Sequence, residues 1–148
     1  MRTLKEVDFS GKSVILRCDL NVPLDGEQIT DDGRIKASLP TIQFLLNAGA
    51  RITILAHLGR PKNGFENVFS LTPVAKRLSE LLKEPVTLAR DLVDLKSSSS
   101  ESQRVRMLEN IRFFPQETSK DEQERKAFAK ELSALGEIYV GDGFGAVH

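Results

Sequence analysis

The sequence predicts an α/β protein with a doubly wound, mostly parallel sheet and helices on both of its faces. Short apolar runs rich in branched residues alternate with longer segments whose apolar residues recur every three or four positions. The short runs are typical of buried strands, and the longer segments are typical of amphipathic helices. Strands separated by such helices form βαβ units, which make neighbouring strands parallel. The 148 residues give room for one domain with a substantial core.

The first part of the chain contains a strand, a turn, a helix and a second strand. Residues 13–20 (Ser-Val-Ile-Leu-Arg-Cys-Asp-Leu) suit a buried strand, and residues 24–27 (Leu-Asp-Gly-Glu) suit a turn. Helical spacing begins at Ile35, and Pro40 within it predicts a kink or two abutting helices. The second strand is expected at 51–58. The apolar positions at helical spacing are Ile35, Leu39, Ile42, Leu45 and Leu46.

The middle of the chain continues this alternation. A second helix is expected at 70–82, with Pro73 in the first turn, where proline is tolerated. A short strand is expected at 85–89. The serine-rich residues 97–100 predict an exposed loop, and residues 105–111 predict a third clear strand.

The last predicted elements are a helix and a strand. Residues 119–122 (Ser-Lys-Asp-Glu) have the spacing of a capping box, with Phe128, Leu132 and Leu135 on the helix behind it. Residues 137–140 predict a closing strand. The pattern does not give the order of the strands within the sheet.

Composition limits the classes of function. Lys plus Arg and Asp plus Glu both number 21, which argues against a polyanion-binding surface over the whole molecule and so against nucleic acid as a partner. The single Cys18 lies in an apolar run and is expected to be a buried structural thiol. The sequence contains neither the apolar stretch of a signal peptide nor a run of membrane-spanning length. We expect a cytoplasmic protein without a membrane partner.

Polar and charged residues gather where the predicted strands end. Asp19 and Asn21 follow the first strand, His57 and Arg60 follow the second, and the third is followed by Glu109, Asn110 and Arg112. Ligands of open parallel sheets bind outside the carboxyl ends of the strands, so these side chains are expected to converge on one rim. The predicted anion donors on this rim are Arg34, His57, Arg60 and Arg112.

The residue types on this rim suit a small phosphorylated hydroxy acid. Arginine presents a planar charged fork that matches two oxygens of a phosphate or a carboxylate. Gly59 allows a tight turn before Arg60, and Asp19 and Asn21 could recognise a hydroxyl beside the anion. The alternatives are a solvated surface charge for each arginine, a turn cap for Asp19 and Asn21, and a structural role for His57.

Residues 141–146 (Gly-Asp-Gly-Phe-Gly-Ala) fit the dinucleotide fingerprint G-x-G-x-x-A, which requires a helix behind it. Such fingerprints usually follow a first strand, whereas this one follows the last, so a dinucleotide-binding domain is the weaker alternative. No G-x-x-x-x-G-K-[ST] stretch exists, so a P-loop is absent. Two histidines and one cysteine, none at ligand spacing, argue against a zinc site.

Several motifs resemble those of the phosphoglycerate kinase family, in the family's order and spacing. The resemblance covers nearly the whole chain. Leu20 stands where phenylalanine is commoner in the family, and Gly141 and Gly143 replace the usual asparagine and alanine. The matching segments are 17–23 (Arg-Cys-Asp-Leu-Asn-Val-Pro), 29–35, 39–42, 57–61 (His-Leu-Gly-Arg-Pro), 108–113 (Leu-Glu-Asn-Ile-Arg-Phe) and 139–145.

The resemblance implies a Rossmann-like domain of an enzyme with two such domains. That enzyme transfers a phosphoryl group in glycolysis from 1,3-bisphosphoglycerate to ADP, giving 3-phosphoglycerate and ATP. Residues 1–148 are expected to be its N-terminal 3-phosphoglycerate-binding domain, incomplete at the carboxyl terminus. The nucleotide-binding domain, which takes ADP or ATP with Mg²⁺, is expected to be absent, so this chain alone should bind no cofactor and be inactive. The complete enzyme is expected to be a monomer.

The resemblance also assigns roles to site residues. It implies that Asp19, Leu20 and Asn21 line the hydroxyl and carboxyl end of the substrate. It implies that Arg34 is the catalytic residue that faces the phosphoryl group in flight. The residues implied to hold the phosphate that is not transferred are His57, Leu58, Gly59, Arg60 and Arg112. A stand-alone module that binds a small phosphorylated anion without chemistry is the alternative.

Overall fold

A computed structural model describes residues 2–3, 8–59, 66–97, 104–114, 120–141 and 146–147. The strands are β1 (Arg2–Thr3), β2 (Ser13–Arg17), β3 (Leu24–Asp25), β4 (Gln28–Ile29), β5 (Arg51–Leu55), β6 (Val86–Ala89), β7 (Val105–Leu108), β8 (Ile138–Val140) and β9 (Ala146–Val147). The α-helices are α1 (Gly33–Asn47), α2 (Thr72–Leu82), α3 (Leu92–Ser97) and α4 (Glu122–Ser133), and the 3₁₀ turns are η2 (Asn67–Phe69) and η3 (Ile111–Phe113).

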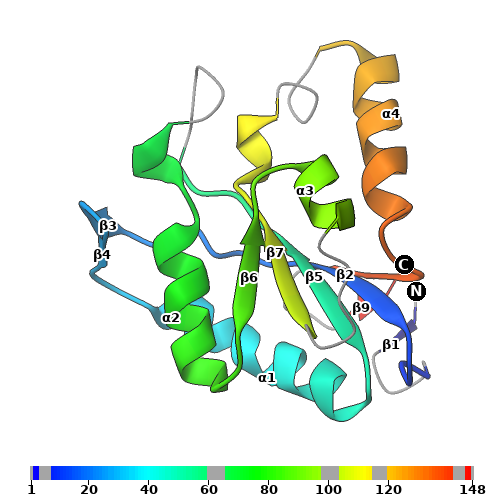
Figure 1. Cartoon of the computed structure of the whole chain (residues 1–148), viewed down its shortest axis with the longest axis horizontal. Coiled ribbons are helices and arrows are strands. Elements are labelled where there is room, and N and C mark those ends of the chain that lie inside the picture. The colour runs from blue at the N-terminus through cyan, green and yellow to red at the C-terminus, as the bar shows by residue number, and fades with distance from the viewer. Residues whose placement is uncertain are drawn as a thin grey trace.

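Within the described residues the main sheet has 7 strands in the order β1-β9-β8-β2-β5-β7-β6 (Figure 1). The strands from β8 to β6 are parallel to one another. At one edge of the sheet β9 pairs antiparallel with β8, and β1 pairs antiparallel with β9. The pairing of β1 with β9 brings the two ends of the chain side by side. The predicted α/β class with a mostly parallel sheet is confirmed.

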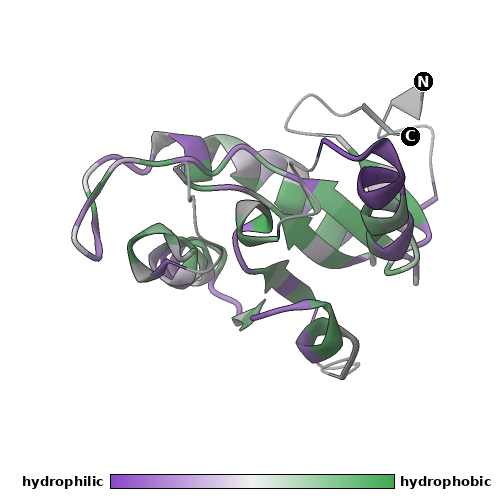
Figure 2. Ribbon diagram, turned by 90° about the horizontal axis from the view of Figure 1, so that it is seen from above, coloured by the Kyte–Doolittle hydropathy of each residue, from purple (hydrophilic) through white to green (hydrophobic). Residues whose placement is uncertain are grey.

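Alternating side chains of the strands pack into two separate hydrophobic cores, one on each face of the sheet. Val14 and Leu16 of β2 belong to a cluster with the buried faces of α1 and α2, whereas Ile15 belongs to a cluster with α3 and α4. Figure 2 shows the apolar strands at the centre of the molecule with helices around them. Both faces of the sheet are therefore covered by helices, as a parallel sheet requires.

The helix α1 passes through Pro40 without a break, so the expectation of two abutting helices is wrong. Pro40 lies on the exposed side of the helix, where water can solvate the carbonyl that loses its partner. Ile35 and Ile42, on either side of the proline, are both fully buried against the sheet. Packing on the opposite face therefore keeps one helix continuous across the proline.

The start of α4 also differs from the expectation. The helix begins at Glu122, and its cap is Asp121, whose Oδ1 accepts a hydrogen bond from the Gln123 amide at 2.9 Å. The predicted capping box is therefore wrong, because Glu122 is the first helical residue and Asp121 is the cap. Ser119 lies outside the described residues.

The predicted strand boundaries extend too far at their carboxyl ends. The first predicted strand at 13–20 ends at Arg17, the second at 51–58 ends at Leu55, and the third at 105–111 ends at Leu108. In each case the motif residues that follow lie outside the strand, in irregular chain or, from Ile111, in a 3₁₀ turn. The short helix α3 was not predicted, and Ser97, which was expected in a loop, is its last residue.

Two further findings concern the sequence expectations. Cys18 is 4% exposed, which confirms its expected burial. Among the described residues, no helix is long and apolar enough to cross a membrane.

Candidate functional site

The carboxyl ends of the parallel strands bring the predicted site segments to one edge of the sheet (Figure 1). The ladder pairs Arg17 at the end of β2 with Leu55 at the end of β5, and the Cys18 amide donates to the Leu55 carbonyl at 3.0 Å. The Ile111 amide, beyond β7, donates to the Ala56 carbonyl at 3.0 Å. Segments that are far apart in the sequence therefore leave the sheet side by side.

Arg34 lies over the turn that follows β2. Its Nη1 contacts Asp19 Oδ1 at 3.2 Å and the Asn21 carbonyl oxygen at 2.8 Å. Asp19 Oδ1 also accepts a hydrogen bond from the Asn21 amide at 3.3 Å, as in an Asx turn. Asp19, Asn21 and Arg34, which were all expected on the rim, are therefore in contact, and the side chains of the ion pair are both 54% exposed.

The start of α1 fixes the position of Arg34. Asp31 Oδ1 accepts a hydrogen bond from the Gly33 amide at 2.8 Å, which turns the chain into the helix. Asp32 binds Lys36 within the helix at 3.4 Å and Arg77 of α2 at 2.9 Å. The hydrogen bond from Arg77 lowers the pKa of Asp32 below its ordinary value, with a smaller contribution from Lys36. These contacts tie the first turn of α1, and with it Arg34, to α2.

The turn at Gly59 is held by Asn21. The Gly59 amide donates to Asn21 Oδ1 at 2.9 Å, so the two strand-end segments are joined directly. Gly59 has a φ of +62°, and an added Cβ would overlap the ring of Phe69. Glycine is therefore required here for both its backbone conformation and the close approach of the ring.

Glu109 and Asn110, which follow β7, form a buried group that the sequence analysis did not assign to the site. Asn110 Nδ2 donates to the Leu58 carbonyl at 2.7 Å and to the Phe69 carbonyl at 3.0 Å. The sequence analysis placed this carboxyl and amide pair directly after an apolar strand but gave it no role. Buried polar groups in that position need internal partners.

The other predicted site residues are placed less completely. Leu20 and Leu58 are 0% and 3% exposed, so both residues belong to the core. His57 is half-buried between β5 and Gly59. Arg60 lies outside the described residues. Arg112 belongs to η3, but its side chain lies outside the described part of the chain.

The glycine-rich end does not have the geometry of a dinucleotide fingerprint. Residues 142–145 lie outside the described residues, and Ala146–Val147 form the strand β9. The fingerprint requires a helix at that point. The alternative of a dinucleotide-binding domain is therefore wrong.

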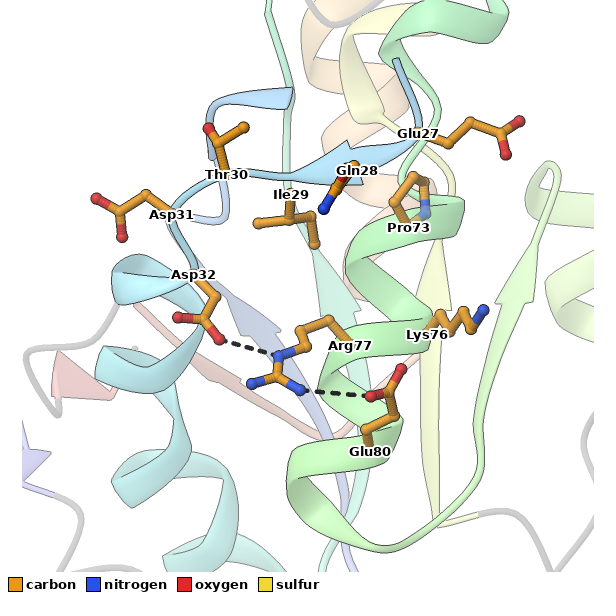
Figure 3. A pocket seen from close by; sticks show the side chains of 10 residues that line it. All are labelled: Glu27, Gln28, Ile29, Thr30, Asp31, Asp32, Pro73, Lys76, Arg77 and Glu80. Atoms are coloured by element: carbon orange, nitrogen blue, oxygen red, sulfur yellow. Dashed lines mark hydrogen bonds and ion pairs between the residues drawn. The ribbon is translucent and has the colours of Figure 1, made fainter. Parts of the chain in front are cut away.

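Two cavities border the hairpin β3–β4. The larger, of about 650 Å³, lies between the hairpin, the start of α1 and α2 (Figure 3). Arg77 inside it is bound to Asp32 and to Glu80, so this arginine holds the two helices together. The smaller, of about 310 Å³, is bordered by Asn21 and Gly59 and adjoins the assembled rim. The smaller cavity is therefore the one that belongs to the candidate site.

The family model of phosphoglycerate kinase matches residues 4–148. A phosphoglycerate kinase of Leifsonia xyli is 52% identical over 100% of this chain, and one of Bifidobacterium longum is 54% identical over the same extent. This chain spans 38% of the length of both curated relatives.

Solved structures give the same result. The crystal structure of phosphoglycerate kinase from Pyrococcus horikoshii has a TM-score of 0.82 and 35% identity, over 96% of this chain and 36% of that one. The structure of phosphoglycerate kinase from Coxiella burnetii has a TM-score of 0.80 and 40% identity, over 93% of this chain and 34% of that one.

Proposed function

The chain belongs to the phosphoglycerate kinase family, and from this premise we propose that it holds the glycerate side of the reversible transfer of a phosphoryl group from 1,3-bisphosphoglycerate to ADP. The products of that glycolytic reaction are 3-phosphoglycerate and ATP. The observation that carries the proposal is Arg34, which Asp19 and the Asn21 carbonyl hold at the carboxyl edge of the sheet. A permanently charged donor fixed at that edge suits the phosphate and carboxylate oxygens of a glycerate ligand.

In this proposal different residues of the rim bind different parts of the substrate. Asp19, Leu20 and Asn21 line the hydroxyl and carboxyl end of the substrate, and the exposed Asp19 and half-buried Asn21 make the contacts. Arg34 contacts the phosphoryl group in transfer and is the catalytic residue. The residues that hold the phosphate that is not transferred are His57, Leu58, Gly59, Arg60 and Arg112, with Gly59 acting through its backbone.

The chemistry at this rim is positioning and charge neutralisation. Phosphoryl transfer passes through a loose transition state, in which negative charge is spread over the equatorial oxygens. A guanidinium that is already oriented by its neighbours reorganises little when that charge develops. Arg34 can keep its contact with Asp19 and still present its other N–H donors to the ligand. No covalent intermediate with the protein is required.

The nucleotide and its metal belong to another part of the proposed enzyme. Phosphoglycerate kinases use ADP or ATP with Mg²⁺. Among the described residues, no group of three His, Cys, Asp or Glu side chains could hold a metal ion. In our proposal residues 1–148 are the N-terminal 3-phosphoglycerate-binding domain, and a separate domain binds Mg²⁺ with the nucleotide. The complete enzyme is proposed to be a cytoplasmic monomer.

Titration of the ¹⁵N-labelled chain with 3-phosphoglycerate tests this proposal. We expect saturable shifts of the amide signals of Asn21 and Gly59, because both lie on the proposed rim. Glycerate without its phosphate should bind at least about tenfold more weakly, because it loses the charge-assisted contacts. Equal affinity for the two compounds, or the absence of saturable shifts, contradicts the proposed function.

A further inference from the structure

The carboxyl side chain of Glu109 is the centre of a buried hydrogen-bond group. It accepts from the Ser70 hydroxyl and the Leu71 amide, both at 2.7 Å, and from its neighbour's amide, Asn110, at 2.9 Å. Glu109 is 3% exposed, so water cannot replace these donors. The start of α2 and the turn after β7 are therefore fixed to one another through a single side chain.

Asn110 extends this group toward the rim. Its one amide nitrogen donates to the carbonyls of Leu58 and Phe69, which come from two different segments. A neutral side chain with two N–H donors on one atom is needed to satisfy two carbonyls at once, and only asparagine and glutamine provide it. Asn110 is 0% exposed, so loss of this donor leaves both carbonyls without a replacement partner.

The residues that Asn110 holds are those that shape the Gly59 turn. Leu58 precedes Gly59, and the ring of Phe69 packs where a Cβ of Gly59 would be. From the other side, Asn21 Oδ1 accepts the Gly59 amide. The turn is therefore held by Asn110 through the Leu58 carbonyl and by Asn21 through the Gly59 amide, and Asn21 also contacts Arg34 through its carbonyl oxygen.

We propose that Asn110, supported by Glu109, is a positioning residue of the glycerate site. It holds the Gly59 turn in the conformation that binds the ligand, without touching the ligand itself. The inference rests on the proposed function, because the Gly59 turn matters for binding only if the rim takes a glycerate. It goes beyond that function by assigning a role in binding to a side chain that is fully buried.

The test uses two nearly isosteric variants and one control. Asn110→Asp keeps the size of the side chain but places an oxygen against the carbonyls of Leu58 and Phe69. Glu109→Gln keeps one acceptor oxygen, and the Ser70 hydroxyl can then accept instead of donate. The control is Leu78→Ala, in which a buried side chain of α2 is shortened away from the rim. Each variant is studied by urea unfolding, calorimetric titration with 3-phosphoglycerate and amide hydrogen exchange without ligand.

We expect Asn110→Asp to weaken the binding of 3-phosphoglycerate by at least about tenfold, because the Gly59 turn loses the hydrogen bonds from Asn110 that hold its conformation. Leu78→Ala should lower the urea midpoint about as much as Asn110→Asp lowers it, but should change the affinity less than about twofold. Glu109→Gln should have an affinity and a urea midpoint close to those of the parent chain. A fall in affinity that simply follows the urea midpoint in all variants overturns the proposal, since it would mean a structural role alone.

Hydrogen exchange separates this proposal from the proposed function. In Asn110→Asp the Gly59 amide should exchange at least about tenfold faster relative to the amides of β5, while this ratio stays constant in Leu78→Ala. If the parent chain does not bind 3-phosphoglycerate, the proposed function fails, and the exchange of Gly59 alone decides whether Asn110 positions the turn. An unchanged ratio in Asn110→Asp overturns the positioning role even if the ligand binds.

Discussion

Two polar groups lie at the carboxyl edge of the sheet, and the largest difference between them is their exposure to solvent. The exposed pair, Asp19 and Arg34, follows β2 and opens α1, and each side chain is 54% exposed. The buried pair, Glu109 and Asn110, follows β7 and is 3% and 0% exposed. Both pairs contain an acidic side chain and a nitrogen donor, and they follow β2 and β7, which lie on either side of β5.

This difference in exposure separates two tasks. An exposed ion pair contributes only about 0–1 kcal/mol to stability, so Arg34 can exchange part of its contacts for a ligand at little cost to the fold. A buried group left without its partner costs about 1–3 kcal/mol, so Glu109 and Asn110 cannot exchange theirs. The exposed pair is suited to binding, and the buried pair is suited to holding the loops in place.

The largest effect is expected from Glu109→Ala. The substitution leaves the donors of Ser70, Leu71 and Asn110 without the acceptor that they share, so we expect a loss of about 3 kcal/mol in the free energy of unfolding. Urea unfolding measures the loss. Asp19→Ala is the matched control and should change stability by no more than about 1 kcal/mol. Equal losses in the two variants would remove the distinction between the pairs.

A smaller effect, seen in binding rather than in stability, is expected from Arg34→Ala. The loss of a charge-assisted contact with the ligand costs about 1.5–3 kcal/mol, which is a roughly tenfold to hundredfold weaker affinity for 3-phosphoglycerate. Calorimetry measures the affinity, and urea unfolding should show little change because the side chain is exposed. Lys36→Ala removes another exposed cation of the same helix and serves as the control. If both variants weaken binding alike, Arg34 contributes only general charge.

The smallest effect concerns the ion pair that fastens the first turn of α1. The hydrogen bond from Arg77 lowers the pKa of Asp32 in the folded chain below the ordinary value of 3.8. A lowered pKa of an acid contributes stability above the unfolded value, and this contribution is lost as pH falls through the lower folded value. The difference in stability between the parent chain and Asp32→Asn should therefore be present at neutral pH and shrink below about pH 4.

Urea midpoints of both chains across this range measure the effect, and Arg77→Ala should abolish most of the difference. A difference that stays constant from neutral to acidic pH would show that the Arg77 contact does not stabilise the ionised form of Asp32.

Much of the assembled rim could be predicted because its residues lie directly behind recognisable strands. The sequence analysis placed Asp19, Asn21 and Arg34 on one rim, and the structure brings these three into contact. It did not identify Asn110 as the residue that holds Leu58, because the two are separated by 52 positions and meet only across neighbouring strands. Leu58 was assigned to the ligand, but its side chain belongs to the core.

The sequence by itself determined the alternation of strands and helices, the α/β class, the family motifs and the edge of the sheet on which polar residues gather. These features can be recognised from local periodicity, since each element repeats its apolar pattern within one segment. The tertiary structure alone decided the strand order and the continuity of α1 through Pro40. It also decided that Asn110 is buried while Arg34 is exposed. These depend on which distant segments pack together, and hydrogen bonds between such segments form only after the parallel strands are in register.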